Sequence, residues 1–140
     1  MQKNNFTLSI VTWYNKQKRI LPFRDIDDPY KIWLSEIMLQ QTQIETVIPF
    51  FLKWVSKYPT IKSVANADQE LLLKLWEGLG YYSRCRNFHK ATKIVVGKHG
   101  GVIPDNWLEF RALTGVGDYT AAAVLSMSYN QPYIAFDGNV

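Results

Sequence analysis

The sequence is poor in several features on which other protein classes depend. Its 140 residues include one cysteine, Cys85, which excludes a disulfide framework and a metal cluster ligated by cysteines of this chain alone. With only 8 glycines and 6 prolines, and 47% apolar residues, the chain is neither collagen-like nor disordered. No apolar run is long enough to span a membrane, and the segment from Met1 to Asn5 lacks the apolar core of a secretory signal. We therefore expect one soluble globular domain in a reducing, intracellular compartment.

Acidic residues are missing from one part of the chain, between Glu77 and Asp105. The net charge is +4, and this window holds the basic residues Arg84, Arg86, Lys90, Lys93 and Lys98. A stretch of one sign attracts a polyanion such as nucleic acid, because phosphate contacts release counterions. The same pattern is typical of a solvated helix face, so the charge pattern alone leaves both interpretations open.

Helical periodicity dominates the hydrophobic pattern. Asp28 followed by Pro29 indicates a helix start, and a mostly apolar helix is expected through Leu39. Further helices are expected at 6–14, 61–65, 69–77, 83–98, 105–113 and 120–129, and a weak strand-like alternation is present at 133–136. The sequence predicts an all-α domain of seven or eight helices.

Another helix is expected to begin near Thr42, which forms a capping-box pattern with Glu45, and to run towards Tyr58. Pro49 lies inside it, so we expect a kink or a delayed start.

Glu36 is the first candidate for chemistry. Its neighbours along the predicted helix include Ile32, Trp33 and Leu39, and a carboxylate in such surroundings is costly unless it is paired or protonated. Desolvation raises the pKa of such a group towards the range of a general acid. A glutamate at the edge of the core, paired with a lysine, is the alternative interpretation.

A second candidate is the segment from Leu113 to Ala121, which holds Gly115 and Gly117 around one apolar residue. Two glycines between helices allow a sharp turn that exposes backbone N–H groups at a helix start, where a phosphate can bind. The pattern is typical of a helix-hairpin-helix DNA-binding motif, although a tight corner has the same signature.

Two further segments are informative only in combination with the others. The segment Gly78-Leu-Gly80-Tyr81-Tyr82-Ser-Arg84 places aromatic side chains at the start of the basic helix, and Asp137-Gly138-Asn139 is a turn with a helix cap. Because no helix follows that cap, we expect the chain to be a truncated piece of a longer protein. His89, His99 and Cys85 lack partners at metal-ligand spacing.

Together, these motifs occur in an order that is much more specific than any one of them. The strings are Leu34-Ser-Glu36-Ile-Met-Leu-Gln-Gln41-Thr42-Gln, Gly78-Leu-Gly-Tyr-Tyr-Ser-Arg84, the glycine hairpin and Asp137-Gly-Asn139. Over about residues 7 to 140, the chain resembles the MutY adenine DNA glycosylases of the helix-hairpin-helix superfamily, which includes endonuclease III.

The resemblance implies an enzyme that removes adenine mispaired with 8-oxoguanine or guanine in duplex DNA, after flipping the adenine out of the stack. Glu36 matches the family acid that protonates the purine and activates water, and Asp137 matches the carboxylate that stabilises the oxocarbenium-like sugar. Tyr119 matches a tyrosine near the sugar, and Asn139 an asparagine that positions water. Because the lyase members have lysine at the position of Tyr119, the resemblance implies a glycosylase without strand cleavage.

The resemblance also implies a set of DNA contacts. Gln41 matches a residue wedged into the base stack, and Tyr81 one intercalated near 8-oxoguanine. The expected DNA-binding residues are Gln41, Thr42, Tyr81, Arg84, Gly115, Val116, Gly117 and Thr120. The expected partner is double-stranded DNA carrying the mispair, bound by a monomer in the bacterial cytoplasm and at the nucleoid, with no membrane involved.

For the domain organisation, the resemblance implies an N-terminal helix and lead-in at 1–24, which in the family belongs to the iron-sulfur half-domain. A six-helix barrel follows at 25–136, with the helix-hairpin-helix at about 106–129, and 137–140 begin a further segment. The family usually carries a [4Fe-4S] cluster, whose ligands would lie beyond residue 140, so we expect no metal or cofactor in this chain. We expect weak activity, or none, from the 140 residues alone.

Other function classes remain open at this stage. A non-catalytic helix-hairpin-helix module would bind DNA without releasing a base, and a helical interaction domain would use its basic face only for solubility. A thymine-mismatch glycosylase, which can also lack the lysine, is a further alternative, although the Met-Leu-Gln-Gln-Thr string disfavours it.

Overall fold

The computed structural model describes residues 28–129, and within them every regular element is a helix. The helices are α2 (Pro29–Leu39), α3 (Ile44–Lys57), α4 (Ile61–Ala65), α5 (Gln69–Trp76), α6 (Tyr82–Lys98), α7 (Trp107–Arg111) and α8 (Asp118–Tyr129). The predicted all-α class is confirmed. The predicted helix at 6–14 and the alternation at 133–136 lie outside the described residues.

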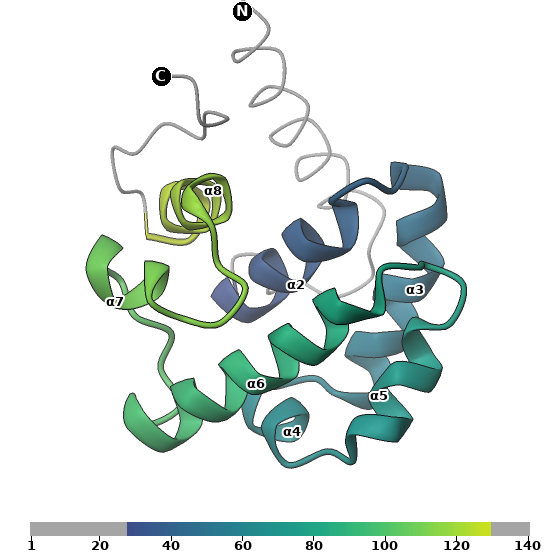
Figure 1. The fold of residues 1–140 in the computed structure, drawn as a ribbon, viewed down its shortest axis with the longest axis horizontal. Helices are drawn as coiled ribbons and strands as arrows, with labels where there is room; N and C mark the ends of the chain where they lie inside the picture. Colours follow the sequence, from purple (N-terminus) through teal and green to yellow (C-terminus); the bar gives the residue numbers. More distant parts are fainter. Residues whose placement is uncertain (1–27, 130–140) are drawn as a thin grey trace, which may run out of the picture.

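Helix α2 occupies the centre of the fold, between α8 and α3 (Figure 1). Asp28 caps its start by accepting a hydrogen bond from the backbone N–H of Tyr30, and Pro29 occupies the first turn, as predicted. Nine of its eleven residues are buried, including Glu36. A helix that is apolar on nearly all sides belongs in the interior, and α3 and α8 pack directly against α2, whereas α4 and α5 pack on α6.

Aromatic side chains from five helices, α2, α3, α5, α6 and α7, form much of the core. The Trp33 ring meets Phe88 and Phe110 edge-on, with ring centroids 4.8 and 5.2 Å apart. Trp54 packs edge-on against Trp76 at 5.8 Å. Burial of these large rings fixes the mutual positions of α2, α3, α5, α6 and α7, and so of the loops that connect them.

The start of α3 differs from the prediction. Its N-cap is Gln43, which makes no side-chain cap, so the predicted Thr42–Glu45 capping box is wrong. The Thr42 hydroxyl instead donates to the Gln40 carbonyl at 3.3 Å and accepts a hydrogen bond from Arg84. Helix α3 begins before Pro49 and continues through it as one helix, so the proline does not delay its start.

Two other helix starts are each shifted by two residues from the predicted positions. Helix α7 is capped by Asn106 and not by Asp105, since the Asn106 side chain accepts from the backbone N–H of Glu109. Helix α8 begins at Asp118, two residues before the predicted Thr120. The division of the chain at 1–24, 25–136 and 137–140 remains a prediction, because the first and third parts lie outside the described residues.

Candidate active site and nucleic-acid interface

Glu36 lies inside the protein, near the C-terminal end of α2. Its side chain is 2% exposed, and its Oε2 atom has no hydrogen-bond partner among residues 28–129. Burial raises the pKa of this carboxyl from its ordinary value of 4.5 to about 8. The alternative of a lysine-paired glutamate gains no support, since the described part shows no ion pair to Glu36. At neutral pH the group is a protonated acid, ready to donate a proton.

Tyr119, in the first turn of α8, lies close enough to Glu36 for the two to interact electrostatically. Burial raises the pKa of its phenol, and the charge of an ionised Glu36 raises it further. The packing of α8 on α2 therefore brings together two residues that are far apart in the sequence. Asp137 and Asn139, the other two predicted catalytic residues, lie outside the described residues.

The glycine hairpin connects α7 to α8, as predicted. Gly115 adopts a φ of +81°, and a Cβ atom added there would lie 2.9 Å from the Cβ of Asn87 on α6. Gly117 has neither a left-handed backbone nor a close neighbour within the described part, so the sharp turn depends on Gly115. Val116, between them, is buried in the core.

An arginine braces the hairpin from the end of α7. Arg111 pairs with Asp118 through its Nε at 2.6 Å and donates from Nη1 to the Val116 carbonyl at 2.9 Å. The ion pair is largely exposed and therefore weak, whereas the bond to the carbonyl fixes the shape of the turn.

The end of α2 and the start of α6 lie next to this hairpin. A pocket of about 190 Å³ separates them, lined by Ile37, Gln40, Arg84, Asn87, Phe88, Thr114 and Gly115. Gln41 and Tyr81 are exposed on the loops beside it, at the end of α2 and the start of α6. The three predicted DNA-contacting segments therefore lie together on one side of the fold.

Two of the predicted DNA-binding side chains point into the protein. The Arg84 guanidinium donates hydrogen bonds to backbone carbonyls of α2 and of the Gly80 turn. Thr120 is buried, and its Oγ1 accepts a hydrogen bond from Gln40 Nε2 at 3.0 Å. These two side chains therefore bond to atoms of the protein itself. In the hairpin, the Val116 N–H is likewise engaged, since it donates to the Leu113 carbonyl at 3.1 Å.

Three residues that shape the candidate site were not predicted from the sequence: Gln40, Asn87 and Arg111. Gln40 links α2 to α8, Asn87 packs against Gly115, and Arg111 braces the hairpin. Only Arg111 had a signal, since it and Asp118 flank the glycine pattern with opposite charges.

The basic helix α6 exposes its cations on a different face. Arg86, Lys90 and Lys93 are exposed and recur at the spacing of one helix face. Arg86 borders an open pocket of about 500 Å³ lined by residues of α5, whereas Asn87 meets the hairpin. The cations of this face therefore do not line the pocket next to the hairpin.

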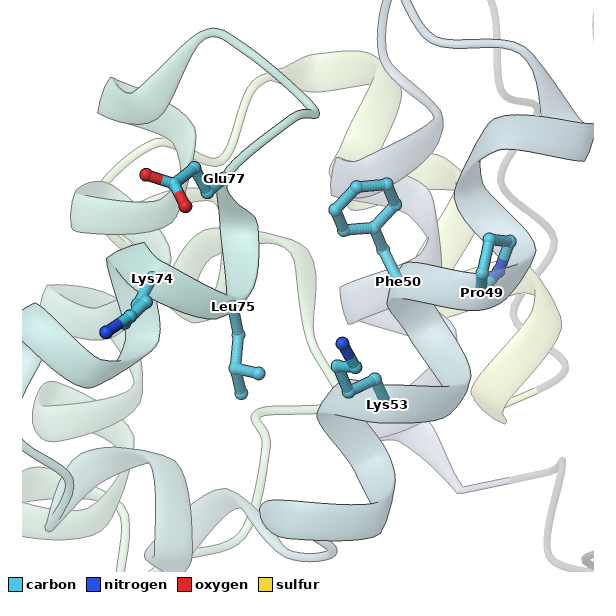
Figure 2. Close-up of a pocket in the computed structure, with 6 residues that line it drawn as sticks. All are labelled: Pro49, Phe50, Lys53, Lys74, Leu75 and Glu77. Atoms are coloured by element: carbon cyan, nitrogen blue, oxygen red, sulfur yellow. The ribbon is translucent and has the colours of Figure 1, made fainter.

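A further pocket of about 280 Å³ lies between α3 and α5 (Figure 2). Its lining residues are Pro49, Phe50, Lys53, Lys74, Leu75 and Glu77. None of these is a predicted site residue, so this concavity is not part of the candidate active site.

The one cysteine does not fit an iron-sulfur cluster. Cys85 is fully buried, and burial raises the pKa of its thiol to about 12, which disfavours the thiolate that a cluster needs. Within residues 28–129, no three His, Cys, Asp or Glu side chains are grouped so that they could hold a metal ion. No helix in this range is long and apolar enough to cross a membrane.

Sequence comparison identifies relatives over nearly the whole chain. The chain is 41% identical over 136 residues to the adenine DNA glycosylase of Buchnera aphidicola subsp. Baizongia pistaciae, a match that covers 96% of this chain and 39% of the relative. It is 42% identical over 144 residues to the human adenine DNA glycosylase, with coverage of 96% and 26%. The chain thus spans well under half the length of the curated relatives it matches.

Structural comparison gives the same fold. A thermostable thymine-DNA glycosylase superposes with a TM-score of 0.72 at 28% identity, covering 92% of this chain and 60% of the other. An endonuclease III bound to DNA in a trapped covalent intermediate superposes with a TM-score of 0.74 at 23% identity, covering 94% and 64%, and so supports the fold alone.

The family comparison covers the candidate site itself. Residues 34–140 match the HhH-GPD superfamily base excision DNA repair proteins, and this range includes Glu36, the Gly80–Tyr81 turn and the glycine hairpin. With three quarters of its length inside that match, the chain belongs to the HhH-GPD superfamily of base excision DNA repair proteins.

Proposed function

We propose that this chain is the helical catalytic core of an adenine DNA glycosylase. The enzyme hydrolyses the N-glycosidic bond of adenine opposite 8-oxoguanine or guanine in duplex DNA. Relatives that carry this name are 33–42% identical to the chain. The observation that carries the proposal is the buried Glu36 carboxyl, which has a raised pKa and lies near Tyr119.

The proposed chemistry needs an acid beside the base and an anion beside the sugar. Glu36, protonated at neutral pH, donates its proton to the adenine ring, which weakens the bond to the sugar. The resulting Glu36 carboxylate accepts a proton from the attacking water. Asp137 stabilises the developing positive charge on the sugar, and Asn139 positions the water. This division of work requires that the environments of the two carboxyl groups separate their pKa values.

Tyr119 supplies a phenol where a lyase has an amine. A phenol cannot form the Schiff base that strand cleavage by β-elimination requires, so the proposed enzyme releases the base and leaves the strand intact.

The proposed DNA contacts follow the surface around the hairpin. Gln41 and Tyr81 enter the base stack, Thr42 lies beside Gln41, and the backbone N–H groups of Gly115 and Gly117 hold a phosphate, since that of Val116 donates to the Leu113 carbonyl. The proposed partner is mispair-containing duplex DNA in the cytoplasm. The [4Fe-4S] cluster typical of the family would take its ligands from beyond residue 140, and no step of this chemistry depends on it.

The test is adenine release from a duplex carrying an 8-oxoguanine:adenine pair, assayed with this chain and with a longer form that includes the sequence after residue 140. Glu36→Gln keeps the shape of the side chain and removes the acid, so we expect release to fall at least 100-fold. Glu45→Gln, at an exposed position in the first turn of α3, is the matched control and should retain activity. Full activity of Glu36→Gln in the longer form would refute the assigned chemistry.

The solved thymine-DNA glycosylase, at 28% identity, gives a reason to test a second substrate. A duplex with a guanine:thymine pair should release no thymine if the proposal holds. Release of thymine and not adenine would identify the alternative function, and salt-dependent binding without any release would indicate a non-catalytic module.

A further inference from the structure

One guanidinium, that of Arg84, holds together the two loops that carry Gln41 and Tyr81. Arg84 lies in the first turn of α6, and its Nη1 donates to the carbonyl oxygens of Ile37 at 2.7 Å and of Met38 at 3.4 Å. Nη1 also donates to the Gln40 carbonyl. The last carbonyls of a helix lack their usual partners, so Arg84 supplies further donors at the end of α2, where the Ile37 carbonyl also accepts from the Gln40 N–H, and it places a cation at the negative pole of the helix.

The same guanidinium reaches the second loop with its other nitrogen. Nη2 donates to Thr42 Oγ1 at 3.4 Å and to the Gly80 carbonyl at 3.3 Å. The guanidinium carbon lies 5.4 Å from the centre of the Tyr81 ring and 5.4 Å from that of Trp76. Arg84 thus bonds to the residue on each side of Gln41 and to the residue before Tyr81, and its charge lies against the Tyr81 ring.

Both residues between these anchors have an unfavourable backbone. Gln41 has a φ of 60° and Tyr81 a φ of 49°, and they are the two non-glycine residues of the described part with a positive φ. A side chain in the left-handed region costs free energy, so this conformation persists only where the surroundings hold it. Gln41 and Tyr81 expose their side chains, and Tyr81 is 60% accessible to solvent.

We propose that Arg84 is a positioning residue that holds Gln41 and Tyr81 in one fixed relation, so that both side chains reach the duplex as a preorganised pair. This inference rests on the proposed function for the DNA contacts of the two residues. The coupling of the two loops, in contrast, exists in the free protein and does not depend on DNA. Because both side chains are already held in place, less conformational entropy is lost when the protein binds DNA.

The shape of the side chain is essential to this role. The planar guanidinium presents several N–H donors in a fixed fork, and it bonds to α2 on one side and to the Gly80 turn on the other. A lysine keeps the charge but has one ammonium group, which cannot reach both loops with the same geometry. We therefore expect Arg84→Lys to fail to restore the coupling, which separates this role from a requirement for charge.

The first arm of the test uses amide NMR spectra of the free chain. Arg84→Lys and Arg84→Met should shift the amide resonances of both loops, at residues 40–42 and 80–82, and change the three-bond coupling constants that report φ at Gln41 and Tyr81. Lys90→Met, at an exposed position further along the same helix, is the matched control and should leave both loops unchanged. Shifts in only one loop, or in neither, would overturn the proposal.

A milder variant covers the case in which Arg84→Met does not fold. Thr42→Val removes one acceptor of the guanidinium and leaves Arg84 in place. In the wild-type background, Thr42→Val should shift the amide resonance of Tyr81. In the Arg84→Lys background, the same substitution should leave that resonance unchanged. An equal effect in both backgrounds would show that the signal does not pass through Arg84.

The second arm uses DNA. A duplex with 2-aminopurine next to an 8-oxoguanine:adenine pair reports unstacking by its fluorescence, and we expect the increase on binding to fall at least fivefold with Arg84→Lys. The slope of log affinity against log salt should stay unchanged, because the guanidinium bonds to the protein. A slope that decreases by about one with Arg84→Met would show a direct phosphate contact and would overturn the proposal. If the wild type does not bind this duplex, the proposed function fails, while the NMR arm still decides whether Arg84 couples the loops.

Discussion

Gln40 donates a hydrogen bond from Nε2 to Oγ1 of Thr120 over 3.0 Å, and this bond joins the end of α2 to the first turn of α8. Gln40 is half-buried and Thr120 is buried, so solvent competes little for the bond. Glu36 lies one turn before Gln40, and Tyr119 comes directly before Thr120. The bond therefore fixes the distance between the two helices beside the proposed acid and phenol.

Breaking this bond should destabilise the fold and loosen the site. Thr120→Val keeps the size of the side chain and removes the acceptor, and we expect the free energy of unfolding to fall by about 1 kcal/mol in a urea titration. Gln40→Leu should lower the free energy of unfolding by a similar amount. The double variant should lose less than the sum of the losses of the two single variants. Strict additivity in this cycle would show that the two side chains do not stabilise each other.

The buried carboxyl of Glu36 should make stability depend on pH. The carboxyl pKa is raised from 4.5 in its ordinary state to about 8 in the fold, so in this interval the folded protein retains a proton that the unfolded chain has lost. Below pH 4.5 the protonated Glu36 side chain makes its full contribution to the free energy of unfolding. This contribution is lost as the pH rises from 4.5 towards 8. The free energy of unfolding should therefore fall by about 1.4 kcal/mol per pH unit across the interval, relative to Glu36→Gln.

The measurement is a pair of urea titrations at pH 5.5 and pH 7.5 for the wild type and for Glu36→Gln. At pH 7.5, Glu36→Gln should be more stable than the wild type but should not release adenine. A catalytic acid in the core thus lowers stability for the sake of activity. Parallel pH profiles of the two proteins would contradict the buried, protonated state of Glu36.

Much of the site could be predicted from the sequence because its signals are local. An acid within an apolar helix is costly unless it is paired or protonated, and glycines between two helices allow a sharp turn, so the sequence predicts the burial of Glu36 and the position of the hairpin. The cap of α3 was predicted wrongly, since the Thr42 hydroxyl bonds to Gln40 and Arg84 and not to its own helix.

That the Arg84 side chain points into the protein could not be predicted from local sequence signals. Most of its partners are backbone carbonyls, which every residue possesses and which leave no mark in the sequence. The acid-free window grouped Arg84 with the exposed cations of the same helix, although its position on that helix faces α2. Side-chain direction on a helix depends on which neighbours pack against it, and this information is distributed over the whole chain.

His89 should make the fold sensitive to acid. Its ring is buried on α6, and Nε2 has no hydrogen-bond partner among the described residues. Burial lowers the pKa of the imidazole, and the charge of Lys93 lowers it further, while hydrogen bonds to the backbone of Val64, Ala65 and Ala67 offset only part of this shift. Because the fold favours the neutral ring, its contribution is complete above the ordinary value of 6.5 and is lost as the pH falls below it. The melting temperature of His89→Gln should change less between pH 7.5 and 5.5 than that of the wild type. His99→Gln, at the half-buried C-cap of the same helix, is the matched control and should follow the wild type.

The two glycines of the hairpin should respond very differently to the same substitution. Gly115→Ala forces a side chain into the left-handed region and brings a Cβ atom to within 2.9 Å of Asn87 Cβ, so we expect a loss of about 1–2 kcal/mol in the free energy of unfolding. Gly117→Ala meets nothing within 4 Å, and its effect on the free energy of unfolding should stay within about 0.5 kcal/mol.

Affinity for duplex DNA should follow the same order, because Gly115 sets the direction of the hairpin N–H groups. Asn87→Ala removes the far end of the neighbouring side chain but leaves its Cβ and the φ of Gly115 in place, so it should not rescue Gly115→Ala. Equal effects of the two glycine substitutions would show that the turn does not depend on the left-handed backbone at Gly115.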